Sequence, residues 1–218
     1  MNSFSVWILA SLRLCALCVF LAVSPSLAAG ENVLSAFFQG LETFQADFEQ
    51  VVTDGSGRVL ERAGGKVAIQ RPDRFRWDYE RPYRQLLLSD GTWLWNHDPD
   101  LRQATRHRLD EALSGTPAML LARPDILTEL FEVRTLEPRD GLQWTELVPK
   151  EDDAQFERVR LGFTDGSLTA MQLVDGFGRI TNIRFTRIRR NAAIPAGRFR
   201  FEPPAGTDVI GDDRHHNR

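Results

Sequence analysis

Alternation of apolar and polar residues dominates the chain from residue 43 onward. In the segment Arg74-Phe75-Arg76-Trp77-Asp78-Tyr79-Glu80, aromatic residues occupy every second position, with a charged residue at each position between them. Successive side chains of a strand point to opposite faces, so this segment predicts a strand with one aromatic and one charged face. Related patterns predict strands over residues 43–53, 58–70, 74–80, 84–89, 92–97, 101–107, 130–136, 142–148, 156–164, 168–174, 178–188 and 198–202.

Asp-Gly pairs separate many of these predicted strands. They begin at residues 54, 90, 140, 165 and 175, and apolar or β-branched segments flank each of them. Asp-Gly readily adopts the positive φ angles that tight hairpin turns require. The pairs therefore predict an antiparallel meander.

A helical pattern opens the part of the chain that precedes the strands. Apolar residues recur there at the spacing of one helix face, at Val33, Leu34, Phe37, Phe38 and Leu41. This spacing predicts a short amphipathic helix.

A second region without alternation spans residues 109–131. Thr116 can cap a helix whose first residue is Pro117, and Pro124 can end that helix and begin another. We expect two or three short helices that, together with the first helix, cover one opening of a curled sheet. Their apolar residues are Leu109, Leu113, Met119, Leu120, Leu121, Ile126, Leu127 and Leu130.

The beginning of the chain has the pattern of an export signal. Arg13 precedes an apolar run from Leu14 to Val23, and the small residues Ser26 and Ala28 follow at the positions that a signal peptidase requires. We expect residues 1–28 to be a cleaved signal peptide; the alternative is an uncleaved membrane anchor. The remainder suits one domain over residues 29–210 with a polar tail over residues 211–218.

Removal of this signal changes the chemistry available to the protein. Both cysteines, Cys15 and Cys18, lie within it, so no disulfide, thiol nucleophile or cysteine metal site is expected in the mature chain. Of the 27 Lys and Arg side chains only Arg13 is lost, against 30 Asp and Glu, so the mature domain is mildly acidic. This balance gives no electrostatic case for binding nucleic acid or an anionic membrane surface.

Catalytic motifs are scarce in the sequence. It has no phosphate-binding glycine loop, no Gly-x-Ser-x-Gly and no Ser-x-x-Lys. The cluster most like a metal site is His97, Asp98 and Asp100, followed by His107, although such a cluster more often forms a polar turn organised by the intervening Pro99. We expect no enzymatic activity and no cofactor, and keep a metal-dependent hydrolase as an alternative.

Several predicted strands carry large apolar side chains on one face. These groups are Phe44, Ala46 and Phe48; Phe75, Trp77 and Tyr79; Trp93 and Trp95; and Leu161 and Phe163. They could interdigitate with a second sheet in a packed sandwich, or they could line the cavity of a half-barrel. Periodicity alone does not separate these two structures.

Six segments resemble the family of periplasmic outer-membrane lipoprotein carriers, LolA. They occur in the order found in that family, behind an export signal. They are FQADFEQVVTDGSG (44–57), RPDRFRW (71–77), SDGTWLW (89–95), QAT (103–105), TPAMLLAR (116–123) and FEPPAGTDV (201–209).

The resemblance implies a mainly β (α+β) fold, an unclosed antiparallel barrel of about eleven strands covered by a lid of short helices. Carriers of this family take acylated lipoproteins from an inner-membrane ABC transporter, cross the periplasm and deliver them to an outer-membrane receptor. The resemblance therefore favours the cavity over the packed sandwich. The acyl-binding residues would be Phe44, Phe48, Phe75, Trp77, Tyr79, Trp93, Trp95, Met119, Leu120, Leu121 and Phe163, with Arg74, Arg76, Asp78 and Glu80 hydrating the outer face.

Arg71 has a specific role in this resemblance. Its place before Pro72 matches the family's arginine that hydrogen-bonds to the lid and keeps the ligand-free form closed. The five donors of a guanidinium suit it to hold several carbonyl groups at once.

The resemblance also predicts a periplasmic monomer that binds no nucleic acid. The alternatives are a half-barrel regulatory protein that senses mislocalised lipoproteins and the hydrolase centred on His97, Asp98 and Asp100.

Overall fold

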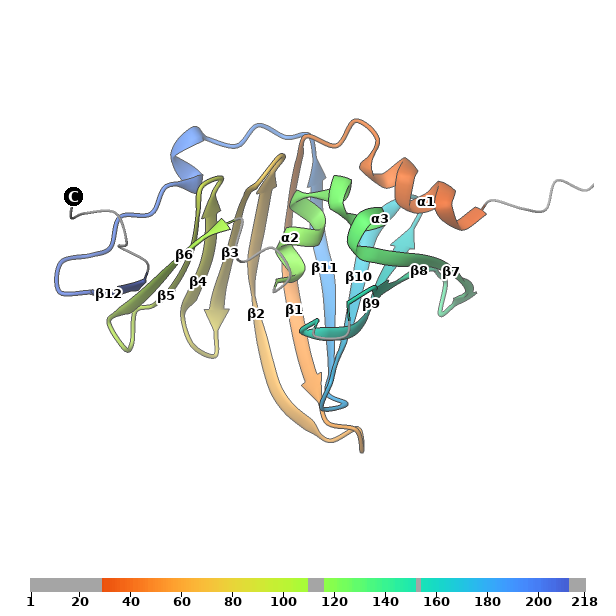
Figure 1. Cartoon of the computed structure of the whole chain (residues 1–218), viewed down its shortest axis with the longest axis horizontal. Coiled ribbons are helices and arrows are strands. Elements are labelled where there is room, and N and C mark those ends of the chain that lie inside the picture. The colour runs from red at the N-terminus through yellow and green to blue at the C-terminus, as the bar shows by residue number, and fades with distance from the viewer. Residues whose placement is uncertain (1–28, 110–115, 152–153, 212–218) are drawn as a thin grey trace, which may run out of the picture.

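The computed structural model describes residues 29–109, 116–151 and 154–211, and its main feature is one curved sheet of twelve strands (Figure 1). The strand order is β12-β6-β5-β4-β3-β2-β1-β11-β10-β9-β8-β7. All paired neighbours are antiparallel except β12 and β6, which are parallel. Because β12 and β7 remain at opposite edges, the barrel is unclosed, as predicted.

Most strands lie within a few residues of their predicted positions. Their bounds are β1 Thr43–Thr53, β2 Val59–Gln70, β3 Arg74–Arg81, β4 Gln85–Asp90, β5 Trp93–Asp98, β6 Gln103–Arg108, β7 Phe131–Arg139, β8 Leu142–Pro149, β9 Phe156–Thr164, β10 Ser167–Asp175, β11 Ile180–Arg190 and β12 Asp208–Gly211. The antiparallel meander is confirmed, and the long strands β1, β2 and β11 lie at its centre.

The described helices are short. They are α1 (Ala29–Phe38), α2 (Pro117–Ala122), the 3₁₀ helix η2 (Pro124–Ile126), α3 (Leu127–Leu130) and the 3₁₀ helix η3 (Ala196–Phe199). α2 begins at Pro117 and η2 begins at Pro124, as the proline positions predicted. The Thr116 side chain makes no capping hydrogen bond, so the fixed φ of Pro117 marks this start without help from the hydroxyl. Leu113 and the predicted segments 1–28 and 212–218 lie outside the described residues.

The five Asp-Gly pairs all lie at hairpin connections, but they act in two ways. Asp140-Gly141 and Asp165-Gly166 have positive φ at both residues, which is the geometry of a tight two-residue turn. At residues 54, 90 and 175, the aspartate carboxylate instead accepts two backbone N–H bonds from the following loop. At Asp54 a further hydrogen bond from the Ser56 hydroxyl is the main cause of a pKa lowered to about 2.

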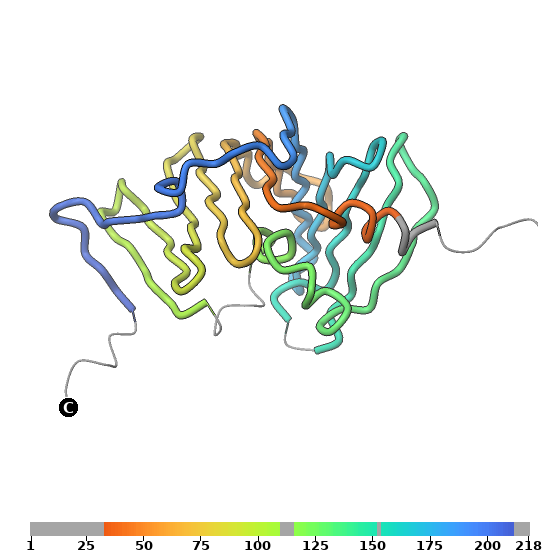
Figure 2. The backbone as a smooth tube through the Cα atoms, turned by 90° about the horizontal axis from the view of Figure 1, so that it is seen from above, coloured from red at the N-terminus to blue at the C-terminus, as the bar shows by residue number. Residues whose placement is uncertain are grey.

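The two faces of the sheet are covered by different segments. The larger apolar cluster occupies the concave face and includes the side chains of α1, α2 and α3 that point to the sheet. A smaller cluster of Leu86, Leu88, Trp95 and Ala104 lies on the other face, with Trp93 and Phe201 packed against it. In Figure 2 the C-terminal segment (blue) runs along the side of the sheet opposite to α2 and α3 (green).

Ion pairs also hold the C-terminal segment to the outer face. Asp78 on β3 pairs with Arg76 at 2.8 Å and with Arg198 of η3 at 2.8 Å. Arg76 and Asp78 are thus largely covered, contrary to the expectation that they only hydrate the outer face. Glu80 does lie in an exposed pair with Lys66, and Arg74 is exposed.

The predicted strand at residues 198–202 is wrong. Phe199 is buried within η3, and Phe201, in the extended segment after it, packs against the outer cluster; neither residue joins the sheet. The edge of β6 is taken by β12, which the sequence analysis missed because Asp208–Gly211 is only four exposed residues long. The alternating pattern at residues 198–202 correctly indicated buried aromatic side chains, but it did not show whether the segment forms backbone hydrogen bonds with a neighbouring strand.

Gly65 permits a close approach between β2 and β3. It lies in register between Phe48 of β1 and Tyr79 of β3, whose rings meet edge to face at 5.2 Å between centroids. A β carbon at this position would collide with the backbone carbonyl oxygen of Asp78. The glycine is thus required by close contact between neighbouring strands.

We expect Gly65→Ala to lower the free energy of unfolding by about 1–3 kcal/mol, because the added methyl group forces β2 and β3 apart. Urea denaturation of the mature chain measures this change. Gly176→Ala is the matched control, since nothing lies within 4 Å of its β-carbon position. Equal stability of the two variants would contradict this account.

Candidate functional site

The concave face carries a continuous group of buried aromatic rings at the centre of the sheet. Phe48 lies 4.9 Å from Trp77, and Trp77 lies 6.1 Å from Phe185, between ring centroids. Phe75 is fully buried, and Phe48 and Trp77 are 1% and 2% exposed. The aromatic face predicted from residues 74–80 therefore points into the concavity.

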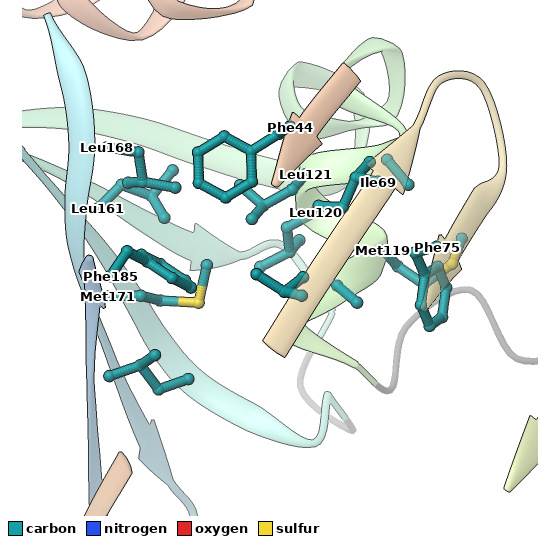
Figure 3. Close-up of a cluster of buried hydrophobic side chains, with 14 of the residues drawn as sticks. Phe44, Ile69, Phe75, Met119, Leu120, Leu121, Leu161, Leu168, Met171 and Phe185 are labelled. Carbon is teal, nitrogen blue, oxygen red and sulfur yellow. The ribbon is translucent and has the colours of Figure 1, made fainter. Parts of the chain in front are cut away.

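Helix α2 is inserted into this concavity. Five of its residues, Ala118 to Ala122, are buried, so the helix is surrounded by protein on all sides. Figure 3 shows Met119 beside Phe75, with Leu120 and Leu121 between Ile69 and the Leu161 side of the sheet. A helix that is apolar all round is stable only in such an enclosed position. In this arrangement the side chains of α2 fill the space that the concave face encloses.

Nine of the predicted acyl-binding residues lie together on this face. Eight belong to the main apolar cluster and Tyr79 packs against it: Phe44, Phe48, Phe75, Trp77, Met119, Leu120, Leu121, Phe163 and Tyr79. The arrangement brings together residues from β1, β3, β9 and α2.

The placement of Trp93 and Trp95 in the same cavity is wrong. Trp95 belongs to the outer cluster, where its ring meets Phe201 at 5.3 Å, and Trp93 packs against that cluster. Leu94, between them, points to the concave face. Ring size suggested that the two tryptophans point inward, but the C-terminal segment provides apolar cover on the outer face.

The concave face is polar at the end where β3 finishes and β4 begins. A pocket of about 600 Å³ is lined by Gln50, Glu61, Tyr79, Gln85 and Asp98, among others. Tyr79 donates a hydrogen bond from its hydroxyl to Oε1 of Gln50 at 3.3 Å. Burial raises the pKa of Tyr79 to about 12, with a smaller contribution from the charge of Glu61. Along β3 the inner face thus changes from hydrocarbon at Phe75 to a hydroxyl at Tyr79.

Arg71 holds the end of helix α1. One of its terminal nitrogens, Nη1, donates hydrogen bonds to the carbonyl oxygens of Phe38 at 3.0 Å and Leu41 at 2.8 Å. The guanidinium also lies over the Phe38 ring, 5.6 Å from its centroid. Burial lowers the pKa of Arg71 while the charge of Asp125 on η2 opposes the change. The arginine therefore bonds to α1 and interacts with the α2–α3 region through charge.

Two further residues share this task and were missed by the sequence analysis. Arg190, at the end of β11, donates a hydrogen bond to the carbonyl of Phe37 at 2.8 Å, and Asn191 donates one to the carbonyl of Gly40 at 2.8 Å. Asn191 also accepts from the backbone N–H of Glu42. We define the α1 clasp as Arg71, Arg190 and Asn191.

A separate ion pair ties α2 to the sheet. Arg123, which follows α2, lies 3.2 Å from the carboxylate of Asp73 in the β2–β3 turn and 3.5 Å from that of Asp125. Asp73 has a positive φ of 70° in this turn. The β2–β3 turn therefore contacts α1 through Arg71 and α2 through Asp73.

The residues of the hydrolase alternative do not converge. Asp98 accepts backbone N–H bonds from Asp100 and Leu101, both at 3.0 Å, and so caps its own turn. His97 points to the outer face, with its ring 4.9 Å from that of Phe201. Among residues 29–109, 116–151 and 154–211, no group of three or more His, Cys, Asp or Glu side chains is arranged to hold a metal ion.

An unclosed antiparallel sheet, an apolar concave face and helices inserted into it define a class of half-barrel proteins suited to apolar ligands. Comparison with known sequences identifies the family. Residues 39–202 match the family described as outer membrane lipoprotein carrier protein LolA. The chain belongs to this family.

Relatives of known sequence match this chain over most of their length. An outer-membrane lipoprotein carrier protein of Dechloromonas aromatica is 41% identical over 193 residues, which cover 88% of this chain and 93% of the relative. One from Methylobacillus flagellatus is 42% identical over 185 residues, covering 85% and 90%. An uncharacterized conserved protein from Thermus thermophilus is similar in fold, with a TM-score of 0.53 at 12% identity, over 84% of this chain and 98% of that one.

Within the part of the chain that the structure describes, none of the helices has the length and apolarity needed to cross a membrane.

Arg71→Leu should leave the sheet folded but loosen α1, because two carbonyl groups lose their donor while Arg190 and Asn191 remain. We expect faster backbone hydrogen exchange in the last turn of α1 and little change in β1, measured by mass spectrometry. Arg74→Leu, an exposed arginine in the same turn region, is the control. Unchanged exchange in α1 would remove Arg71 from the clasp.

Proposed function

We propose that this protein is a periplasmic carrier that accepts acylated lipoproteins from an inner-membrane ABC transporter and delivers them to an outer-membrane receptor. The acyl chains bind on the concave face, where α2 lies in the present structure. The observation that carries the proposal is the set of nine apolar residues converging there from strands and α2, in a chain whose relatives are named for lipoprotein transport.

The physical need for such a carrier follows from the cost of exposing hydrocarbon to water. An acyl chain of about 14 carbons resists leaving a bilayer by on the order of 10 kcal/mol. Spontaneous crossing of an aqueous compartment is negligible at that cost. A carrier whose apolar surface covers the acyl chain lowers the free-energy cost of moving that chain through water.

Loading requires α2 to leave its place. Since Met119, Leu120 and Leu121 fill the concave face, acyl chains can occupy it only by displacing them. The exchange replaces one set of apolar contacts with another, so the two arrangements can be close in free energy. Near balance permits both uptake and release, whereas very tight binding would trap the cargo.

The α1 clasp and the Arg123–Asp73 pair influence the equilibrium between the closed arrangement, with α2 in place, and the loaded one. Both favour the closed arrangement, and the ion pair is partly exposed, so its contribution is small. Arg71 acts as the latch in this proposal by holding α1 over the apolar cluster. Nothing in this cycle requires a cofactor or a catalytic residue.

Displacement of α2 and α3 can be measured with spin labels attached to introduced cysteines. Both native cysteines lie in the predicted signal peptide, so the mature chain has no other cysteine that the label could modify. We expect a spin-label pair at Glu129→Cys and Arg74→Cys to show a longer distance when a synthetic diacylated lipopeptide is added. A pair at Arg62→Cys and Arg74→Cys, within β2 and β3, should not change. An unchanged Glu129–Arg74 distance in the presence of saturating bound ligand would contradict lid displacement.

The transport function is tested by adding the purified mature protein to spheroplasts of a Gram-negative cell that synthesises labelled lipoprotein. We expect release of lipoprotein as a soluble one-to-one complex. An unrelated periplasmic protein is the negative control, and a carrier of known activity shows that the transporter works. No release under those conditions would overturn the proposal.

A further inference from the structure

The indole N–H of Trp77 is a buried hydrogen-bond donor inside the candidate site. Trp77 is 2% exposed, and its Nε1 has no hydrogen-bond acceptor among the described residues. Two other polar groups on aromatic rings of the same sheet are paired: Trp144 donates to the carbonyl of Arg139 at 3.2 Å, and Tyr79 donates to Gln50. Buried donors are nearly always paired, so this one calls for a functional explanation.

Trp77 lies where the inner face of β3 changes character. On one side is Phe75, which is fully buried against Met119 of α2. On the other side is Tyr79, whose hydroxyl is bonded to Gln50 and which lines the polar pocket. Along β3, Trp77 thus lies between a residue in the hydrocarbon part of the concavity and one that lines its polar end.

An acylated lipoprotein has the same change of character along its length. Chains that are attached through a glycerol end at ester carbonyl groups, beyond which come the glycerol and the polypeptide. A carbonyl oxygen can accept an N–H hydrogen bond, and it is the first acceptor reached from the hydrocarbon end. A cargo with its chains beside Phe75 and its polar end in the pocket would place its ester groups near Trp77.

We propose that the Trp77 indole N–H donates a hydrogen bond to an ester carbonyl of the bound cargo and so fixes how deeply the acyl chains enter. This inference rests on the proposed carrier function and adds a chemical selectivity to it. Trp77 is a positioning residue that selects chains attached through an ester over chains of equal length without a carbonyl. Because the donor is unpaired when α2 fills the site, its pairing with cargo favours the loaded arrangement.

The experiment compares two synthetic lipopeptides with the same peptide and chain length, one with ester-linked chains and one with ether-linked chains. Binding of each is measured for the mature protein, for Trp77→Phe and for Trp144→Phe. Phenylalanine keeps an aromatic ring in place but removes the donor. Trp144, paired in register with Gly162, lies on the other face of the sheet and provides the same substitution away from the site.

We expect the wild-type protein to prefer the ester ligand over the ether ligand by roughly threefold to tenfold, the effect of one hydrogen bond. Trp77→Phe should lose this preference, because ester binding weakens more than ether binding, while Trp144→Phe keeps it. The indole proton signal of Trp77, assigned by its loss in Trp77→Phe, should move downfield with the ester ligand and less with the ether ligand. Retained binding of the ether ligand by Trp77→Phe shows that the variant is folded.

An ester preference that survives in Trp77→Phe, or equal binding of both ligands by the wild-type protein, would overturn this inference and leave the carrier function standing. If neither ligand binds the wild-type protein, both the inference and the carrier proposal are overturned.

Discussion

The carbonyl groups at the end of α1 are the constraint on which the rest of the structure depends. A helix end leaves its last carbonyl groups without intrahelical partners, and here Arg71, Arg190 and Asn191 supply donors to them. These residues come from the β2–β3 turn and the end of β11, the two segments flanking β1 in the sheet. The clasp therefore joins the helix to both neighbours of the strand that follows it, and so places Phe37 against Phe44 and Phe163.

The β2–β3 turn connects this clasp with the inserted helix. Arg71 donates to the carbonyl of Phe38 in α1, and Asp73, two residues later, pairs with Arg123, which follows α2. The strand that leaves this turn carries Phe75, Trp77 and Tyr79 on its inner face and Asp78, bonded to Arg198, on its outer face. One hairpin thus contributes to both helices, to the candidate ligand surface and to the anchoring of the C-terminal segment.

Much of this organisation could be predicted from local sequence patterns. Alternation located the strands, Asp-Gly pairs located the hairpins, and Pro117 and Pro124 located the helix starts, because each signal depends on a few neighbouring residues. The inner or outer position of Trp93 and Trp95 depended on a segment a hundred residues away, and so did the partner of β6. Arg190 and Asn191 gave no local signal, since their role exists only once α1 is packed against the end of β11. The resemblance to the LolA family supplied Arg71 and the choice of cavity over sandwich, which periodicity could not.

The unclosed sheet has a consequence for behaviour at high concentration. Its two edges could pair with another copy and build an extended aggregate. One edge is the four-residue strand β12, too short to offer a long ladder. The other, β7, contains Pro138, an irregular register between Leu136 and Arg139, and an exposed Glu132–Arg134 ion pair. These features oppose intermolecular strand addition, so the sheet can remain unclosed without pairing with a second copy of the chain.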